Sequence, residues 1–225
     1  MGVFIIKIIF FDTETSGLNC HFCKIIELAM LTVENGKIIE EYDEFINIGQ
    51  PLEPKITRLT GISDETLRRE GIDEEIVAND LKERLTKGTL MVAHNCYFDL
   101  SFVYQLLKRH FPSEAYDIVS NVDWIDTLTV FKDRRKFPHK LIDAVEKYGI
   151  EMVNFHRAIE DTKALYQVTL AMKVERDDLR YYKNIFGYNP KYPIYNSEFK
   201  FIKFKSQPYR NVDSKVDFED ILPNK

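Results

Sequence analysis

Residues 10–18, Phe10-Phe11-Asp12-Thr13-Glu14-Thr15-Ser16-Gly17-Leu18, are the stretch around which the rest of the chain is organised. They end an apolar run, residues 3–11, that only Lys7 interrupts. Such a run is typical of a strand buried on both faces in an α/β sheet. Residues two apart in a strand point to the same side, so we expect Asp12 and Glu14 to be aimed together at one place. A divalent cation would offset their repulsion; the alternative is two solvated acids at a strand end, with Gly17 closing a turn.

Length and composition indicate an ordinary soluble protein. The chain has 225 residues, 30% charged and 44% hydrophobic, enough for one substantial core or a domain with an appendage. No apolar stretch reaches the roughly 18 residues that span a bilayer, and the N-terminal run lacks a secretory cleavage site. Three cysteines cannot all pair, which favours a reducing, cytoplasmic compartment. Cys20 and Cys23 have no second Cys/His pair at zinc spacing, which disfavours a structural zinc site.

The order of the periodic segments predicts the fold class. Extended runs at 25–33 and 37–48 flank Asn35-Gly36, a hairpin signal, and make an antiparallel meander with the first strand. Buried strands at 90–93 and 124–128 alternate with helical patterns, which are expected at residues 72–87, 98–109, 139–148 and 158–173. We therefore predict an α/β fold: a mixed five-stranded sheet with helices on both faces and the first strand at its centre.

The chain changes character after residue 175, which predicts one domain over residues 1–175 and an appended segment over 176–225. The net charge is −5, but the acidic excess lies in the first part and the segment 176–225 is mildly basic and rich in Phe and Tyr. Residues 199–205 interleave aromatics with lysines. These residues could stack on bases and follow phosphates, or the aromatics could pack this segment on the main core. Packing is the favoured interpretation.

Two later segments end in further acids. Asp99 follows His94-Asn95-Cys96-Tyr97-Phe98, where a buried strand passes into a helix. Asp161 follows His156 by five positions, so both can face one point only if His156 precedes the helix that begins near Ala158. Each acid alone is more often a helix cap. Together, four carboxylates suit two hard cations about 3.5–4 Å apart, and a neutral histidine beside them can accept a proton from water.

The joint pattern resembles the three motifs of the DEDDh 3′→5′ exonuclease family, which includes the proofreading subunit of bacterial replicative polymerases. The matching motifs are Asp12-x-Glu14-x-x-Gly17-Leu18, His94-Asn95-x-x-Phe98-Asp99 and His156-x₄-Asp161. The likeness covers about residues 4–175; the Cys20–Cys23 loop and the segment 176–225 lie outside it. It implies a ribonuclease H-like sheet and two Mg²⁺ or Mn²⁺ ions per active site.

The resemblance also implies a role for each matching residue. Asp12 would bridge the two ions, Glu14 and Asp161 would hold the first ion, and Asp99 would support the second. His156 would be the general base. The residues that would meet the terminal nucleotide are Thr13, Leu18, Leu59, Thr60, His94 and Phe98.

The resemblance implies hydrolysis of single-stranded DNA from its 3′ end to nucleoside 5′-monophosphates, in proofreading or repair. The expected partner is a single-stranded nucleic acid 3′ end, with a DNA polymerase subunit as a second candidate and no membrane. An exoribonuclease that trims RNA ends or short oligomers stays open, because the sequence does not reveal contacts with the 2′-hydroxyl. An inactive binding module is disfavoured, since all the expected catalytic carboxylates are present.

Overall fold

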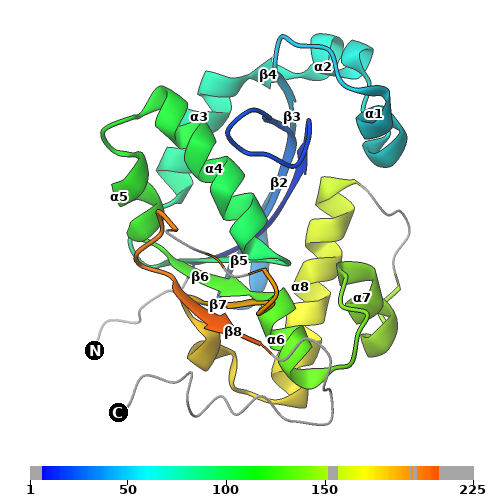
Figure 1. Ribbon diagram of the computed structural model, residues 1–225, viewed down its shortest axis with the longest axis vertical. Helices are drawn as coiled ribbons and strands as arrows, with labels where there is room; N and C mark the ends of the chain where they lie inside the picture. Colours follow the sequence, from blue (N-terminus) through cyan, green and yellow to red (C-terminus); the bar gives the residue numbers. More distant parts are fainter. Residues whose placement is uncertain (1–6, 152–156, 193, 195–196, 208–225) are drawn as a thin grey trace.

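The computed structural model describes residues 7–151, 157–192, 194 and 197–207, and it confirms the α/β fold class. A six-stranded mixed sheet has the order β4-β3-β2-β1-β5-β6, so the first strand lies inside the sheet as expected. Helices pack on both faces of this sheet (Figure 1). The strands are β1 (Lys7–Thr15), β2 (Ile25–Glu34), β3 (Lys37–Asn47), β4 (Ile72–Asp73), β5 (Thr89–Ala93) and β6 (Asp123–Asp126).

The sheet has one strand more than the five expected. β4 contributes two residues, which pair in parallel with Ile46 and Asn47 at the end of β3. Two residues cannot display an alternating pattern, so the helix expected over residues 72–87 included them, whereas the observed helix begins at Glu74. The hairpin between β2 and β3 turns at Asn35 and Gly36, which have φ values of 51° and 74°. Asn and Gly adopt these positive angles most readily, which explains the turn.

The helices follow the expected segments, with shifted ends and several short additions. They are α1 (Pro54–Thr60), α2 (Asp64–Glu70), α3 (Glu74–Arg84), α4 (Cys96–His110), α5 (Ala115–Ser120), α6 (Thr127–Arg134), α7 (Leu141–Tyr148) and α8 (Ala158–Glu175). A 3₁₀ helix covers Leu179–Tyr182. None of the helices in the described part of the chain is both long and apolar enough to cross a bilayer.

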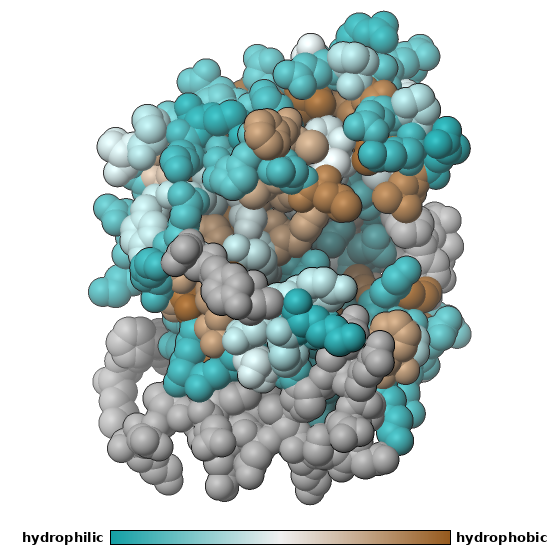
Figure 2. All heavy atoms as spheres, in the orientation of Figure 1, coloured by the Kyte–Doolittle hydropathy of each residue, from teal (hydrophilic) through white to brown (hydrophobic). Residues whose placement is uncertain are grey.

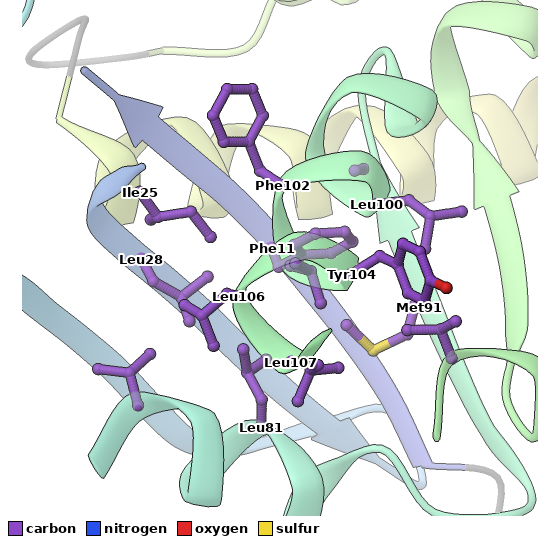
Figure 3. Close-up of a cluster of buried hydrophobic side chains, with 14 of the residues drawn as sticks. Phe11, Ile25, Leu28, Leu81, Met91, Leu100, Phe102, Tyr104, Leu106 and Leu107 are labelled. Atoms are coloured by element: carbon purple, nitrogen blue, oxygen red, sulfur yellow. The ribbon is translucent and has the colours of Figure 1, made fainter. Parts of the chain in front are cut away.

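β1 is apolar on both sides because each side meets a different layer of helices. Ile9 and Phe11 belong to the larger core cluster, together with apolar residues of α3 and α4 (Figure 3). Phe10 lies in a second cluster with Leu165 of α8. Alternate residues of β1 therefore face α4 and α8 in turn, and this alternation determines where its acidic end points.

The part of the chain beyond residue 175 that the structure describes packs against the main sheet and its helices. β7 (Ile185–Tyr188) and β8 (Lys203–Ser206) form a small parallel sheet of their own. Phe199 is buried, and its ring lies 5.3 Å from that of Tyr104 and 6.0 Å from that of Tyr97, both on α4. These contacts favour the packing interpretation of the aromatic residues. The domain boundary at residue 175 stays a prediction.

Candidate active site

Three carboxylates meet where β1 ends beside the first turns of α8. Ligand oxygens of Asp12, Glu14 and Asp161 all lie within 4.8 Å of one another. Asp12 and Glu14 share the side of β1 that also carries Phe10, the side covered by α8. Asp161 is the fourth residue of α8. Among the described residues, this is the only group of three or more His, Cys, Asp and Glu side chains that converges so closely.

Asp99 reaches the same end of β1 from the opposite layer. It lies in the first turn of α4 and is buried. Its Oδ1 accepts a 2.7 Å hydrogen bond from the hydroxyl of Thr13, the residue between Asp12 and Glu14. Asp99 is not one of the three converging ligands, yet its charge is close enough to raise the pKa of Asp12. The structure thus brings all four predicted carboxylates to one end of the sheet.

Burial and mutual repulsion both raise the pKa values of the carboxylates at this site. Burial, and then the charges of Asp99, Asp161 and Glu14, raise the pKa of Asp12 well above its ordinary value. Burial raises the pKa of Glu14 to about 8, with the charge of Glu27 as the next cause. Burial likewise raises the pKa of Asp99 to about 7, although the Thr13 hydrogen bond opposes this rise.

No lysine or arginine in the described residues forms an ion pair with Asp12, Glu14 or Asp99. The donor set consists of carboxylate oxygens, which are the ligands that hard divalent cations prefer. Bound cations would favour the charged forms of these acids, and so offset both the burial and the mutual repulsion that hold their pKa values high. The residues present therefore fit divalent metal ions.

The expected general base, His156, lies outside the described residues. Arg157 and Ala158, directly after it, are described, and Ala158 begins α8. The position of His156 relative to the carboxylates stays a prediction.

The expected nucleotide contacts fall into two groups by exposure. Leu18 is 89% exposed on the loop between β1 and β2, and Leu59 is 58% exposed on α1. Thr13 and Thr60 are buried, and the hydroxyl of Thr60 donates to the carbonyl of Ile56 at 3.0 Å. The face of the molecule drawn in Figure 2 has a hollow near its middle, with apolar residues gathered on the upper side of the hollow. The exposed side chains of Leu18 and Leu59 are therefore free to contact a ligand, whereas Thr13 and Thr60 are packed inside the protein.

His94 and Phe98 make contacts within the protein. The ring of Phe98 lies 4.8 Å from that of Phe102, one turn along α4. The two ring nitrogens of His94 lie 3.0 Å from the Thr127 hydroxyl and 2.8 Å from the His139 carbonyl. Because a carbonyl only accepts, Nε2 of His94 carries a proton. This ring ties the end of β5 to α6 and to the loop before α7.

Asp126 is a buried residue of this region to which the sequence assigned no role. Its Oδ1 accepts from the backbone N–H groups of Asn95 at 2.9 Å and Cys96 at 3.2 Å, at the start of α4. It also caps α6, because the N–H groups of Leu128 and Thr129 donate to its two oxygens. One carboxylate thus holds two helix starts, including that of the helix that carries Asp99. Its place at the end of a strand and the start of a helix was the signal in the sequence.

Comparisons with known proteins agree with this geometry. A family model described as "Exonuclease" matches residues 9–169. DNA polymerase III PolC-type of Bacillus subtilis is 36% identical over 166 residues, which are 72% of this chain and 11% of that protein. DNA polymerase III PolC-type of Pediococcus pentosaceus is 34% identical over 161 residues, which are 70% of this chain and 11% of that polymerase. The chain thus spans about a tenth of the length of these relatives.

The fold also has solved counterparts. E. coli exonuclease I in complex with a dA16 oligonucleotide matches with a TM-score of 0.69 and 20% identity, over 77% of this chain and 42% of that one. The zinc-bound form of its complex with single-stranded DNA matches with a TM-score of 0.68, 20% identity and the same coverage. At this identity the likeness shows the fold.

Proposed function

The chain belongs to the exonuclease family, and from this premise we propose that it is a metal-dependent 3′→5′ exonuclease acting on single-stranded DNA. The observation that carries the proposal is the convergence of Asp12, Glu14 and Asp161 within 4.8 Å, with Asp99 beside them. The choice of DNA is supported by the PolC-type DNA polymerase relatives and by the exonuclease I complex with dA16. Proofreading or repair is the proposed role, and a DNA polymerase is the proposed protein partner.

Two Mg²⁺ or Mn²⁺ ions, held by Asp12, Glu14, Asp99 and Asp161, would supply Lewis acidity for attack of water on the last phosphodiester. The carboxylates of this chain orient that chemistry and neutralise the ions. Without bound cations, the negative charges of these four carboxylates would repel the phosphate group of the substrate.

The protein side chains would guide the substrate and move a proton. The exposed side chains of Leu18 and Leu59 would pack on the terminal nucleoside, and the backbone of Thr13 would meet its 3′ end. His156 would accept a proton from the attacking water. The oxygen of that water forms a bond to phosphorus, the bond from phosphorus to the 3′-oxygen breaks, and the departing 3′-oxygen takes up a proton from solvent. The products are a nucleoside 5′-monophosphate and a strand that ends in a new 3′-hydroxyl.

A direct test uses 5′-labelled single-stranded DNA and RNA of the same sequence, with Mg²⁺ or Mn²⁺ and with EDTA. We expect DNA to shorten one nucleotide at a time from its 3′ end, only with the metal ion. Asp12→Ala, Asp161→Ala and His156→Ala should lower the rate by about 100-fold or more, since each removes several kcal/mol of transition-state stabilisation.

Glu160→Ala is the matched control, because Glu160 lies in the same turn of α8 as Asp161 and its described ion pair is with Lys163. It should cut DNA at the wild-type rate. Cleavage that persists in EDTA, or full activity of Asp12→Ala, contradicts the metal-dependent mechanism. Faster shortening of RNA than of DNA contradicts the choice of substrate and favours an exoribonuclease.

A further inference from the structure

Glu27 belongs to an acidic row that crosses three strands on the α8 side of the sheet. In the register of β1 and β2 it stands directly opposite Glu14. On β3, Phe45 stands opposite Glu27, and Asp43 stands opposite Ala29. Because Asp43 is two residues from Phe45, it lies on the same side of the sheet as Glu27 and diagonally next to it. The side chain of Glu27 is 0% exposed. A fully buried carboxylate beside two others is costly unless specific partners compensate it.

The partners of Glu27 come from the start of α8. Its Oε1 accepts a 3.2 Å hydrogen bond from Nε of Arg157, and its Oε2 accepts from the N–H of Ala158 at 3.4 Å. Ala158 is the first residue of α8, and Arg157, at the cap position, offers no side-chain cap of its own. Glu27 therefore supplies from the sheet the acceptor that the helix start lacks.

Arg157 connects Glu27 to the candidate metal site. Its guanidinium lies 3.7 Å from Oδ2 of Asp43 and 5.3 Å from the centre of the Phe45 ring. Its carbonyl oxygen accepts a 3.0 Å hydrogen bond from the N–H of Asp161. Direct contacts thus lead from Glu27 through Arg157 to Asp161, whose carboxylate meets Asp12 and Glu14.

We propose that Glu27 is a positioning residue: with Arg157 it holds the start of α8 so that Asp161 stands in place to share cations with Asp12 and Glu14. This inference rests on the proposed function and deepens it. Glu27 differs from the four predicted ligands because its two carboxylate oxygens already accept from Arg157 and Ala158.

A purely electrostatic effect of these residues makes the opposite prediction for one of them. If only charge mattered, removing the negative charge of Glu27 would weaken cation binding, whereas removing the positive charge of Arg157 would strengthen it. If the pair positions Asp161, both changes weaken cation binding. If the loss of the Glu27 charge and the loss of the Arg157 charge both weaken cation binding, the pair acts by positioning Asp161.

The experiment measures Mn²⁺ binding by calorimetry without nucleic acid, and kcat and KM on a single-stranded oligonucleotide. The variants are Glu27→Gln, Arg157→Gln and the double substitution. We expect each single variant to bind Mn²⁺ about 10–100-fold more weakly, as for partners that orient metal ligands, and to lose kcat with little change in KM. The double variant should be no worse than either single variant, because both act through one arrangement.

Glu41→Gln is the matched control, since Glu41 of β3 also pairs with α8, through Lys163 at 3.0 Å, but both side chains are exposed. It should leave Mn²⁺ binding and kcat unchanged. Tighter Mn²⁺ binding by Arg157→Gln, or unchanged binding by both single variants, overturns the inference. Should Glu27→Gln fail to fold, Arg157→Gln still decides, because its side chain is 47% exposed.

The two proposals fail in distinguishable ways. A wild-type chain that binds Mn²⁺ but cuts neither DNA nor RNA overturns the proposed function alone. The comparison of Mn²⁺ binding among the variants then still decides for or against Glu27. A wild-type chain that binds no Mn²⁺ overturns both.

Discussion

The hydroxyl of Thr13 donates a 2.7 Å hydrogen bond to the carboxylate of Asp99 across an interval of 86 residues. This bond joins β1 to α4 at the point where the two layers bring their acids together. It also lowers the pKa of Asp99 against the rise that burial causes. Thr13 therefore favours the charged form of Asp99, the form that binds a cation.

Replacing Thr13 with Val should impair catalysis without unfolding the protein. The substitution keeps the shape and the β-branched side chain but removes the donor to Asp99. A hydrogen bond to a charged group contributes about 1.5–3 kcal/mol, so kcat/KM should fall by about 10-fold or more. Steady-state kinetics on single-stranded DNA would measure the loss. Thr13→Ser, which retains the hydroxyl, should stay near wild type; equal losses in both variants would show that the hydroxyl is not the cause.

The metal-free protein should lose stability as the pH rises from about 5 to 8. The pKa of Glu14 is about 8 in the folded chain, against an ordinary value of 4.5, because the site is buried and acidic. The unfolded chain releases this proton first, so the folded state becomes less favourable as the pH rises through this window. Thermal melts in EDTA should show a falling Tm, and Mg²⁺ should raise Tm more at pH 8 than at pH 5.5.

Glu14→Gln is the control for this pH effect. It removes the titrating group, so its Tm in EDTA should depend less on pH over the same range. A wild-type Tm in EDTA that climbs steadily from pH 5 to 8 would contradict the proposed origin of the effect.

Asp126→Asn should destabilise the fold more than the loss of an ordinary cap does. The substitution removes a buried carboxylate that accepts N–H donors from the starts of two helices, α4 and α6. We expect a loss of about 3 kcal/mol in the free energy of unfolding, measured by urea titration, since several charged hydrogen bonds weaken together. The comparison is Asp143→Asn, which weakens only the exposed cap of α7 and should cost about 1 kcal/mol. Similar costs for both variants would argue against a double cap.

Phe199→Ala tests whether the segment after residue 175 folds with the main sheet. Phe199 is 4% exposed and belongs to the larger core cluster, so its truncation should cost about 3–5 kcal/mol of the free energy of unfolding. Unfolding should remain one transition, followed both by the fluorescence of Trp124 in β6 and by circular dichroism. Tyr192→Ala, at a side chain 74% exposed, should change little. An unchanged main transition in Phe199→Ala would support an independent appended domain.

The sequence alone was sufficient for the features that depend on neighbours along the chain. The apolar run before Asp12, the Asn35-Gly36 turn and the helical spacing after Ala158 each act over a few residues, so they predicted β1, the β2–β3 hairpin and α8. The spacing of Asp12 and Glu14 predicted that both point to one side of β1, and the two side chains do converge with Asp161.

Only the tertiary structure revealed the partners that hold this site together. Glu27 meets Ala158 across 131 positions, and Asp126 meets Asn95 across 31. His94 likewise finds both of its ring partners on segments more than 30 residues away. A single acidic residue inside an apolar run has the same neighbours in the sequence whether its side chain faces solvent or caps a helix from a distant part of the chain. Its role depends on which helix packs over it, because a buried carboxylate is stable only where donors from elsewhere in the fold surround it.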